Sequence, residues 1–227
     1  MKKITLVSFF LLLASFAMAQ QTVDQMRNDK SAHRVKIVTS KGEMVALLYD
    51  DTPEHRDNFL KLAKQHFYDS LLFHRVIRDF MIQGGDPDSR DAKPGQMLGN
   101  GSLGYTLPAE FVPSHVHRRG ALCAARLGDN VNPAKRSSST QFYIVQGRIW
   151  QPDELEAMAA RAQMQLTPES RKIYTHEGGA PHLDGSYTVF GQIIEGLDVI
   201  DRIAEMNTDR FDRPLQDVYI LRVEILQ

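Results

Sequence analysis

The segment from Phe73 to Asp86 constrains the fold of this chain most, because it places a permanent charge among apolar side chains. Its pattern is typical of two short strands around a polar break. Period-2 alternation predicts that Arg75 lies on one strand face between Phe73 and Ile77, and that Met81 and Gln83 share a face of the next strand. Burying a guanidinium without a partner is costly, whereas a solvated groove lets it keep its charge. The segment therefore predicts one wall of an apolar groove, which suits a neutral peptide better than a charged metabolite.

The same segment, FHRVIRDFMIQGGD, resembles the signature of the cyclophilins, the cyclosporin-sensitive class of peptidyl-prolyl cis-trans isomerases. The resemblance runs from about Val35 to the C-terminus and is interrupted by one long insertion. Further blocks that match the family in order are Gly104–Phe111, Arg119–Leu122, Ser139–Ile144, Leu183–Gly185 and Val189–Gly191. A contiguous signature followed by ordered blocks is a specific signal.

The resemblance implies a mainly β fold, a closed eight-stranded antiparallel barrel capped by two helices, with the substrate groove on its outer wall. The residue pattern agrees, since many short strands are expected beside two helical patterns. Thr52-Pro53-Glu54 predicts the start of the first helix, with Thr52 as its cap and Pro53 in the first turn. The second helix is expected from Leu197 to Ala204.

The insertion, about residues 148–180, departs from compact family members and predicts an α-helical segment. Pro152–Gln163 is rich in good helix formers, and Thr167-Pro168-Glu169 predicts the start of a second helical turn. Two interpretations stay open for this segment. It either embellishes the surface and stabilises the domain, or it gates substrate or binds a partner.

On the family's pattern, Arg75 is the catalytic residue and donates a hydrogen bond to the prolyl nitrogen. The residues that the resemblance assigns to substrate binding line the proline pocket and the neighbouring groove: Phe80, Met81, Gln83, Ala125, Arg126, Gln141, Tyr143, His182, Leu183 and Tyr187. Without the resemblance, Arg75 is interpreted as a surface arginine lying over apolar neighbours, and the apolar pocket residues as ordinary core. No cofactor and no metal is implied.

Four of these positions differ from the commonest eukaryotic pattern. Tyr143 stands in place of Phe, Tyr187 in place of His, Arg126 in place of Asn, and His182 in place of a Trp that helps to hold cyclosporin. The proposed donor is unchanged, so isomerase activity is still expected. Cyclosporin is expected to inhibit weakly, because an imidazole offers less apolar area than an indole.

Other kinds of site lack support in the sequence. His115-x-His117 has no third ligand at metal spacing, so both are interpreted as surface histidines. Cys123, the single cysteine, lies in an apolar run and is expected to be a buried thiol. Ser137–Thr140 lacks the surroundings of a hydrolase nucleophile, and Gly84-Gly85-Asp86 lacks the lysine of a phosphate loop.

The N-terminus is typical of a signal peptide over residues 1–19. Lys2-Lys3 precede an apolar run from Ile4 to Ala14, and Ala17-Met18-Ala19 matches a cleavage site. The alternative is a retained anchor, although the run is short for a membrane span. We expect a flexible leader over residues 20–32, one domain over residues 33–227, and export, most simply to a bacterial periplasm.

Cleavage would remove two basic residues and no acidic one, so the net charge would change from −1 to −3. Such a balance gives no reason to expect nucleic acid or an anionic membrane as partner. The expected partners are proline-containing peptides and unfolded exported proteins, with no stable membrane insertion after cleavage. Two functions are weighed: an isomerase of X–Pro bonds, or a cyclophilin-like module or chaperone that binds peptides with incidental isomerase activity.

Overall fold

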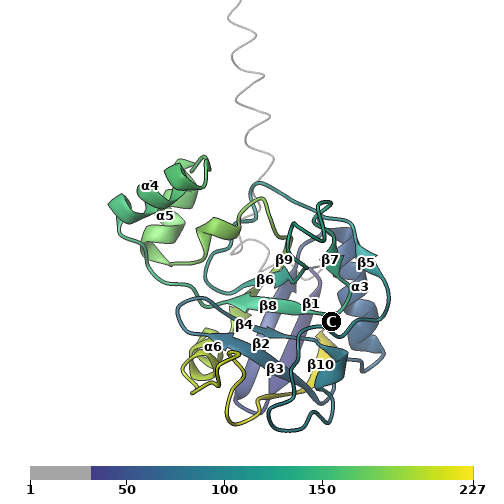
Figure 1. The fold of residues 1–227 in the computed structure, drawn as a ribbon. Coiled ribbons are helices and arrows are strands. Elements are labelled where there is room, and N and C mark those ends of the chain that lie inside the picture. Colours follow the sequence, from purple (N-terminus) through teal and green to yellow (C-terminus); the bar gives the residue numbers. More distant parts are fainter. Residues whose placement is uncertain (1–31, 227) are drawn as a thin grey trace, which may run out of the picture.

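Eight antiparallel strands form a closed barrel in the computed structural model, which describes residues 32–226 (Figure 1). Around the barrel the strands follow the order β1-β10-β3-β4-β8-β6-β9-β2, and β2 pairs with β1 to close it. The barrel strands are β1 (Arg34–Thr39), β2 (Gly42–Leu48), β3 (Leu71–Ile77), β4 (Met81–Gly84), β6 (Ala121–Ala124), β8 (Phe142–Val145), β9 (Val189–Glu195) and β10 (Tyr219–Leu226). Two short strands, β5 (Thr106–Leu107) and β7 (Ser137–Ser138), pair separately. The predicted barrel is confirmed.

Alternation along the strands creates two separate apolar clusters, one inside the barrel and one on its outer wall. On β4, Ile82 belongs to the interior cluster and Met81 to the outer one. On β8, Phe142 belongs to the interior cluster and Tyr143 to the outer one. Met81 and Tyr143 are only 2% and 5% exposed, because partly buried side chains of the same wall pack against them. The candidate site lies on this outer wall.

Two helices close the barrel, as the sequence predicts, and lie on opposite sides of it in Figure 1. Helix α3 (Pro53–Lys64) buries Phe59 and Leu62 in the interior cluster. Helix α6 (Leu197–Ala204) buries Ile200 and Ile203 in the same cluster. Both helices have one apolar face, so burying that face against the barrel interior stabilises the helix and the barrel together.

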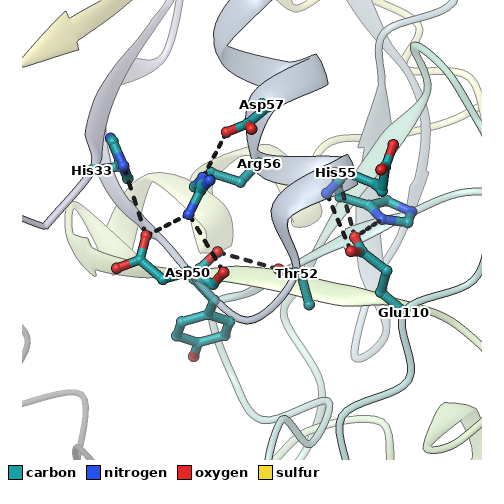
Figure 2. Close-up of polar contacts among 9 residues, drawn as sticks. His33, Asp50, Thr52, His55, Arg56, Asp57 and Glu110 are labelled. Carbon is teal, nitrogen blue, oxygen red and sulfur yellow. Dashed lines mark hydrogen bonds and ion pairs between the residues drawn. The ribbon is translucent and has the colours of Figure 1, made fainter.

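The first turn of α3 is capped by a side chain distant in sequence (Figure 2). The carboxylate of Glu110 accepts hydrogen bonds from the backbone N–H of Glu54 at 3.1 Å and of His55 at 3.0 Å. Thr52 is the N-cap residue, as predicted, but its side chain makes no capping hydrogen bond and its hydroxyl donates back to the carbonyl of Tyr49 at 3.4 Å. A carboxylate satisfies two free N–H groups and also complements the positive end of the helix dipole.

The predicted helical segment between residues 148 and 180 forms a hairpin that projects from the barrel (Figure 1). It consists of α4 (Pro152–Arg161) and α5 (Pro168–His176), here called the α4–α5 hairpin. Thr167 and Ser170 form a reciprocal capping box at the start of α5. Leu155 of α4 and Tyr174 of α5 are 1% and 0% exposed, so the hairpin has its own packed inner face.

The predicted signal peptide, residues 1–19, lies outside the described residues, as does the predicted leader apart from Ala32. Within residues 32–226, no helix combines the length and apolar character needed to cross a bilayer.

Candidate active site

Four outward-facing side chains form a row across four neighbouring strands. Arg75 of β3 lies opposite Gln83 of β4, Gln83 lies opposite Tyr143 of β8, and Tyr143 lies opposite Cys123 of β6. Directly opposed residues in an antiparallel pair share a face and have Cβ atoms about 4.5–5.5 Å apart. The register therefore brings a guanidinium, an amide and a phenol together, although they are distant in sequence.

A bulge in β3 directs Arg75 to the outer wall. Phe73 and Val76 both belong to the interior cluster, and the pairing with β4 shifts between Phe73 and Arg75. The prediction that Phe73 and Arg75 share a strand face is therefore wrong, because the extra residue of the bulge interrupts the alternation. Ile77 packs against the outer cluster, as expected. The predicted pairing of Met81 and Gln83 on one face is confirmed, since both lie on the outer wall.

The guanidinium of Arg75 is held loosely and stays accessible. Its Nη1 lies 3.5 Å from Oε1 of Gln83, and its Nε lies 3.5 Å from a carboxylate oxygen of Asp212. The Arg75 side chain is 43% exposed. Contacts at this distance are at the long limit for hydrogen bonds, so the N–H groups can turn to a ligand at little cost. Arg75 is an accessible charged donor beside the apolar outer cluster.

A chain of side-chain amides determines which atom of Gln83 faces Arg75. Nε2 of Gln141 donates to the carbonyl oxygens of Gly99 and Gly101, both at 3.0 Å. Oε1 of Gln141 must then point the other way, and it accepts from Nε2 of Gln83 at 3.1 Å. Because an amide has its donor and acceptor on opposite sides, Oε1 of Gln83 is directed at the guanidinium.

Apolar and aromatic side chains surround the other end of the row. Met81 and Tyr143 form its buried floor, while Phe80, Leu183, Tyr187 and Ala125 pack against them. The His182 ring lies 5.4 Å from the Phe80 ring, and the Tyr187 ring meets the Tyr143 ring edge-on at 6.0 Å. The structure thus gathers the predicted pocket residues at one place on the outer wall.

Arg126 is placed differently from the other predicted site residues. Its side chain is only 4% exposed, and its guanidinium lies over the Tyr187 ring, 4.3 Å from the ring centre. Nε donates to the carbonyl of Ser186 at 2.7 Å, and Nη1 pairs with Asp129 at 2.5 Å. The charge of Arg126 is therefore engaged by the protein, and the side chain holds the Tyr187 ring in place.

Two polar residues near the row, Asp212 and His117, have no local sequence signal that marks them as part of a site. Asp212 comes from the loop before β10, and its carbonyl accepts from the backbone N–H of Val76 at 2.8 Å. His117 was expected at the surface, and this is wrong, since it is 0% exposed. It is bonded on one side to Asp184 at 2.7 Å and on the other to the hydroxyl of Tyr143 at 2.9 Å. Only the folded chain brings these residues to the pocket.

Burial keeps the Cys123 thiol and the Tyr143 hydroxyl neutral. Burial raises the pKa of the Cys123 thiol and the pKa of the Tyr143 hydroxyl well above their usual ranges. The prediction of a buried thiol is confirmed, since Cys123 is 0% exposed. Within residues 32–226, no three histidine, cysteine, aspartate or glutamate side chains are grouped to hold a metal ion. The arrangement is that of an accessible charged donor beside a cluster of apolar and aromatic side chains.

Comparison with known families decides the identity of the chain. Residues 34–225 match the model of the family described as "Cyclophilin type peptidyl-prolyl cis-trans isomerase/CLD". The chain belongs to the cyclophilin family. The resemblance noted from the signature segment is confirmed, and the family assigns the chain to the peptidyl-prolyl cis-trans isomerases.

Two relatives and one solved structure agree with this assignment. The chain is 35% identical to the "Putative peptidyl-prolyl cis-trans isomerase" of Staphylococcus saprophyticus, over 89% of this chain and 98% of the relative. A protein of the same name from Staphylococcus aureus strain USA300 is 35% identical, over 88% and 96% of the two chains. A crystal structure of a Cryptosporidium parvum cyclophilin type isomerase covers 86% of this chain and 98% of its own, with a TM-score of 0.64 and 23% identity. That structure shares the cyclophilin fold.

Proposed function

We propose that this cyclophilin accelerates X–Pro isomerisation by donating a hydrogen bond from Arg75 to the prolyl nitrogen. The observation that carries the proposal is the placement of Arg75, half-exposed and loosely held, in one row with Gln83 and Tyr143. The proline ring would sit on Met81 and Tyr143, and the substrate backbone would meet the amide of Gln83. These substrate contacts are supported by the positions of Met81, Tyr143 and Gln83, which all lie on the outer wall of the barrel.

The chemistry requires only a donor in a fixed place. Amide resonance gives the X–Pro bond a rotation barrier of about 18–20 kcal/mol. As the bond twists, the nitrogen loses conjugation and its lone pair becomes available to a donor. A guanidinium directed at that nitrogen therefore stabilises the twisted state and affects the planar ground state much less, which is the condition for catalysis. Arginine suits this role because it stays charged and its donors form a rigid fork.

The proposed substrates are proline-containing segments of exported proteins that are still folding. Support comes from the sequence of residues 1–19, with its basic start, apolar run and Ala17-Met18-Ala19 cleavage pattern. N-terminal sequencing of the protein from a periplasmic fraction tests this part. A chain that begins near Gln20 is expected, and a full-length chain found only in the cytoplasm would contradict export.

A protease-coupled assay on a short Ala-Pro peptide tests the activity itself. We expect relaxation to equilibrium much faster than the uncatalysed exchange, which takes tens of seconds or longer. The alternative function, a module that only binds peptides, predicts measurable peptide affinity with exchange at the uncatalysed rate. That result would overturn the proposed enzyme mechanism.

A further inference from the structure

Four polar side chains from separate segments form one buried chain of hydrogen bonds that ends at the pocket. The hydroxyl of Tyr174 on α5 donates to one carboxylate oxygen of Asp184 at 2.6 Å. The other oxygen lies 2.7 Å from Nδ1 of His117, and Nε2 of His117 lies 2.9 Å from the hydroxyl of Tyr143. Tyr174 and His117 are both 0% exposed. The chain thus connects the α4–α5 hairpin to the floor of the pocket.

The partners of Asp184 and His117 determine the direction of these bonds. Asp184 also accepts from the backbone N–H of His117 at 2.8 Å, so its carboxylate receives three donors. An imidazole whose Nδ1–H points at a carboxylate leaves the lone pair of Nε2 free to accept. With His117 in this neutral tautomer, the hydroxyl of Tyr143 donates to its Nε2. Burial raises the pKa of Tyr143 and, aided by Asp184, that of Tyr174, so both hydroxyls keep the protons they donate.

Several hydrogen bonds and one ion pair hold the base of the α4–α5 hairpin in place. The indole Nε1 of Trp150 donates to the carbonyl of Gly179, and the backbone N–H of Trp150 donates to the carbonyl of Tyr174, both at 3.0 Å. Arg118 makes a two-pronged ion pair with Glu177, with distances of 2.9 and 2.6 Å. These contacts lie just before α4 and just after α5. Because Tyr174 of α5 is bonded to Asp184, a shift of α5 either moves Asp184 or breaks that bond.

We propose that the α4–α5 hairpin positions the Tyr143 ring in the proline pocket through Asp184 and His117. Tyr174, Asp184 and His117 are then positioning residues, because none of them touches the substrate. The inference rests on the proposed function, since it concerns the same pocket. The hairpin then also contributes to substrate affinity. Through Asp184 and His117, the hydroxyl of Tyr174 helps to hold the Tyr143 ring against which the proline packs.

The position of the Tyr143 ring affects binding more than the chemical step. Its ring contacts Tyr187 edge-on and belongs to the same cluster as Met81 and Cys123, and the bond of its hydroxyl to His117 adds a polar restraint to this packing. A misplaced Tyr143 ring packs less well on the proline, and this loss is the same whether the X–Pro bond is planar or twisted. Loss of such uniform binding raises KM and leaves kcat nearly unchanged.

The test is a double-mutant cycle on Tyr174 and Tyr143, read as proline-peptide affinity by NMR titration together with kcat and KM. Tyr174→Phe removes one hydroxyl, and we expect Kd and KM to rise about fivefold, the effect of one buried hydrogen bond, with kcat within about twofold. In a Tyr143→Phe background, the same change should have no further effect, because the receiving hydroxyl is gone. Tyr68→Phe, which alters a buried tyrosine of the barrel interior, is the matched control and should leave Kd unchanged.

Two results would overturn the inference: wild-type affinity in Tyr174→Phe, or an equal loss of affinity in both backgrounds. If Tyr174→Phe does not fold, Asp184→Asn takes its place in the cycle, because it keeps the size and one acceptor oxygen. These outcomes differ from a failure of the proposed function, in which the wild-type protein itself would show no isomerase activity. An active wild type with additive effects contradicts only the role of the hairpin.

Discussion

Arg75 and Gln83 lie opposite each other on β3 and β4, and the amide oxygen of Gln83 faces the guanidinium at 3.5 Å. The orientation of the Gln83 amide is fixed by its hydrogen bond to Gln141. The carbonyls of the Gly99–Gly101 loop orient Gln141, and Gln141 orients Gln83. The loop that follows the signature segment thus helps to aim the proposed catalytic donor, through two amides.

Replacing Gln83 by leucine tests this relationship. Gln83→Leu keeps the approximate size of the side chain but leaves Arg75 without its acceptor. We expect kcat/KM to fall about tenfold in the protease-coupled assay, close to the loss of one hydrogen bond to a charged group. Gln165→Leu, at an exposed position of the α4–α5 hairpin, is the matched control and should behave as wild type. Unchanged activity in Gln83→Leu would show that the amide does not orient the donor.

We expect Asp212 to compete with the substrate for the guanidinium of Arg75. Its carboxylate lies 3.5 Å from Nε of Arg75, and both side chains are 43% exposed, so the pair is weak and screened by salt. Asp212→Asn keeps the shape and removes the charge. We expect kcat/KM to rise by up to about threefold at low ionic strength, and its dependence on salt to flatten. A fall in activity at all salt concentrations would mean that the carboxylate orients Arg75 rather than competing for it.

Buried His74 makes stability depend on pH. The ring is 4% exposed, and burial lowers the pKa of His74 from 6.5 to about 4. The folded protein therefore resists protonation, while the unfolded chain takes up the proton near pH 6.5. Stability is full above pH 6.5 and is lost as pH falls from 6.5 to about 4, by roughly 2–3 kcal/mol.

Urea unfolding at a series of pH values measures this loss, and NMR titration of His74 assigns it. The control is His66→Gln, because the His66 side chain is 77% exposed and its replacement should leave the loss assigned to His74 in place. A free energy of unfolding that stays constant between pH 6.5 and 4.5 would contradict the burial argument.

Much of the architecture follows from residue pattern and family resemblance. The barrel, the two closing helices and the helices of the 148–180 segment all have local signals, such as the apolar face of Phe59 and Leu62 or the Thr167-Pro168 start. Such signals are local because helix periodicity and capping involve residues a few positions apart.

The features that the sequence did not predict depend on contacts between distant segments. The capping hydrogen bonds of α3 come from Glu110, more than fifty residues after the helix begins, and not from the side chain of the N-cap residue Thr52. The bulge that turns Arg75 outward is a property of strand pairing, and alternation alone misplaced Phe73. His117 is buried because Asp184 and Tyr143 come to meet it. No local pattern around the histidine shows this.

Cyclosporin sensitivity tests the predicted role of His182. Its ring packs against Phe80 at 5.4 Å, at the edge of the pocket. We expect weak inhibition of the wild type, and at least tenfold tighter inhibition of His182→Trp, because an indole buries more apolar area. Submicromolar inhibition of the wild type would contradict the prediction, as would a tryptophan variant no more sensitive than wild type.

The most direct test of the whole account compares Arg75→Ala with Arg78→Ala, an exposed arginine three residues further along the same segment. NMR exchange spectroscopy on a proline peptide reports both the isomerisation rate and the affinity. We expect Arg75→Ala to lower the catalysed rate about 100-fold or more, as for the loss of a transition-state donor, while Kd changes less than about threefold. Arg78→Ala should match wild type. Exchange in Arg75→Ala as fast as in wild type would contradict the central claim.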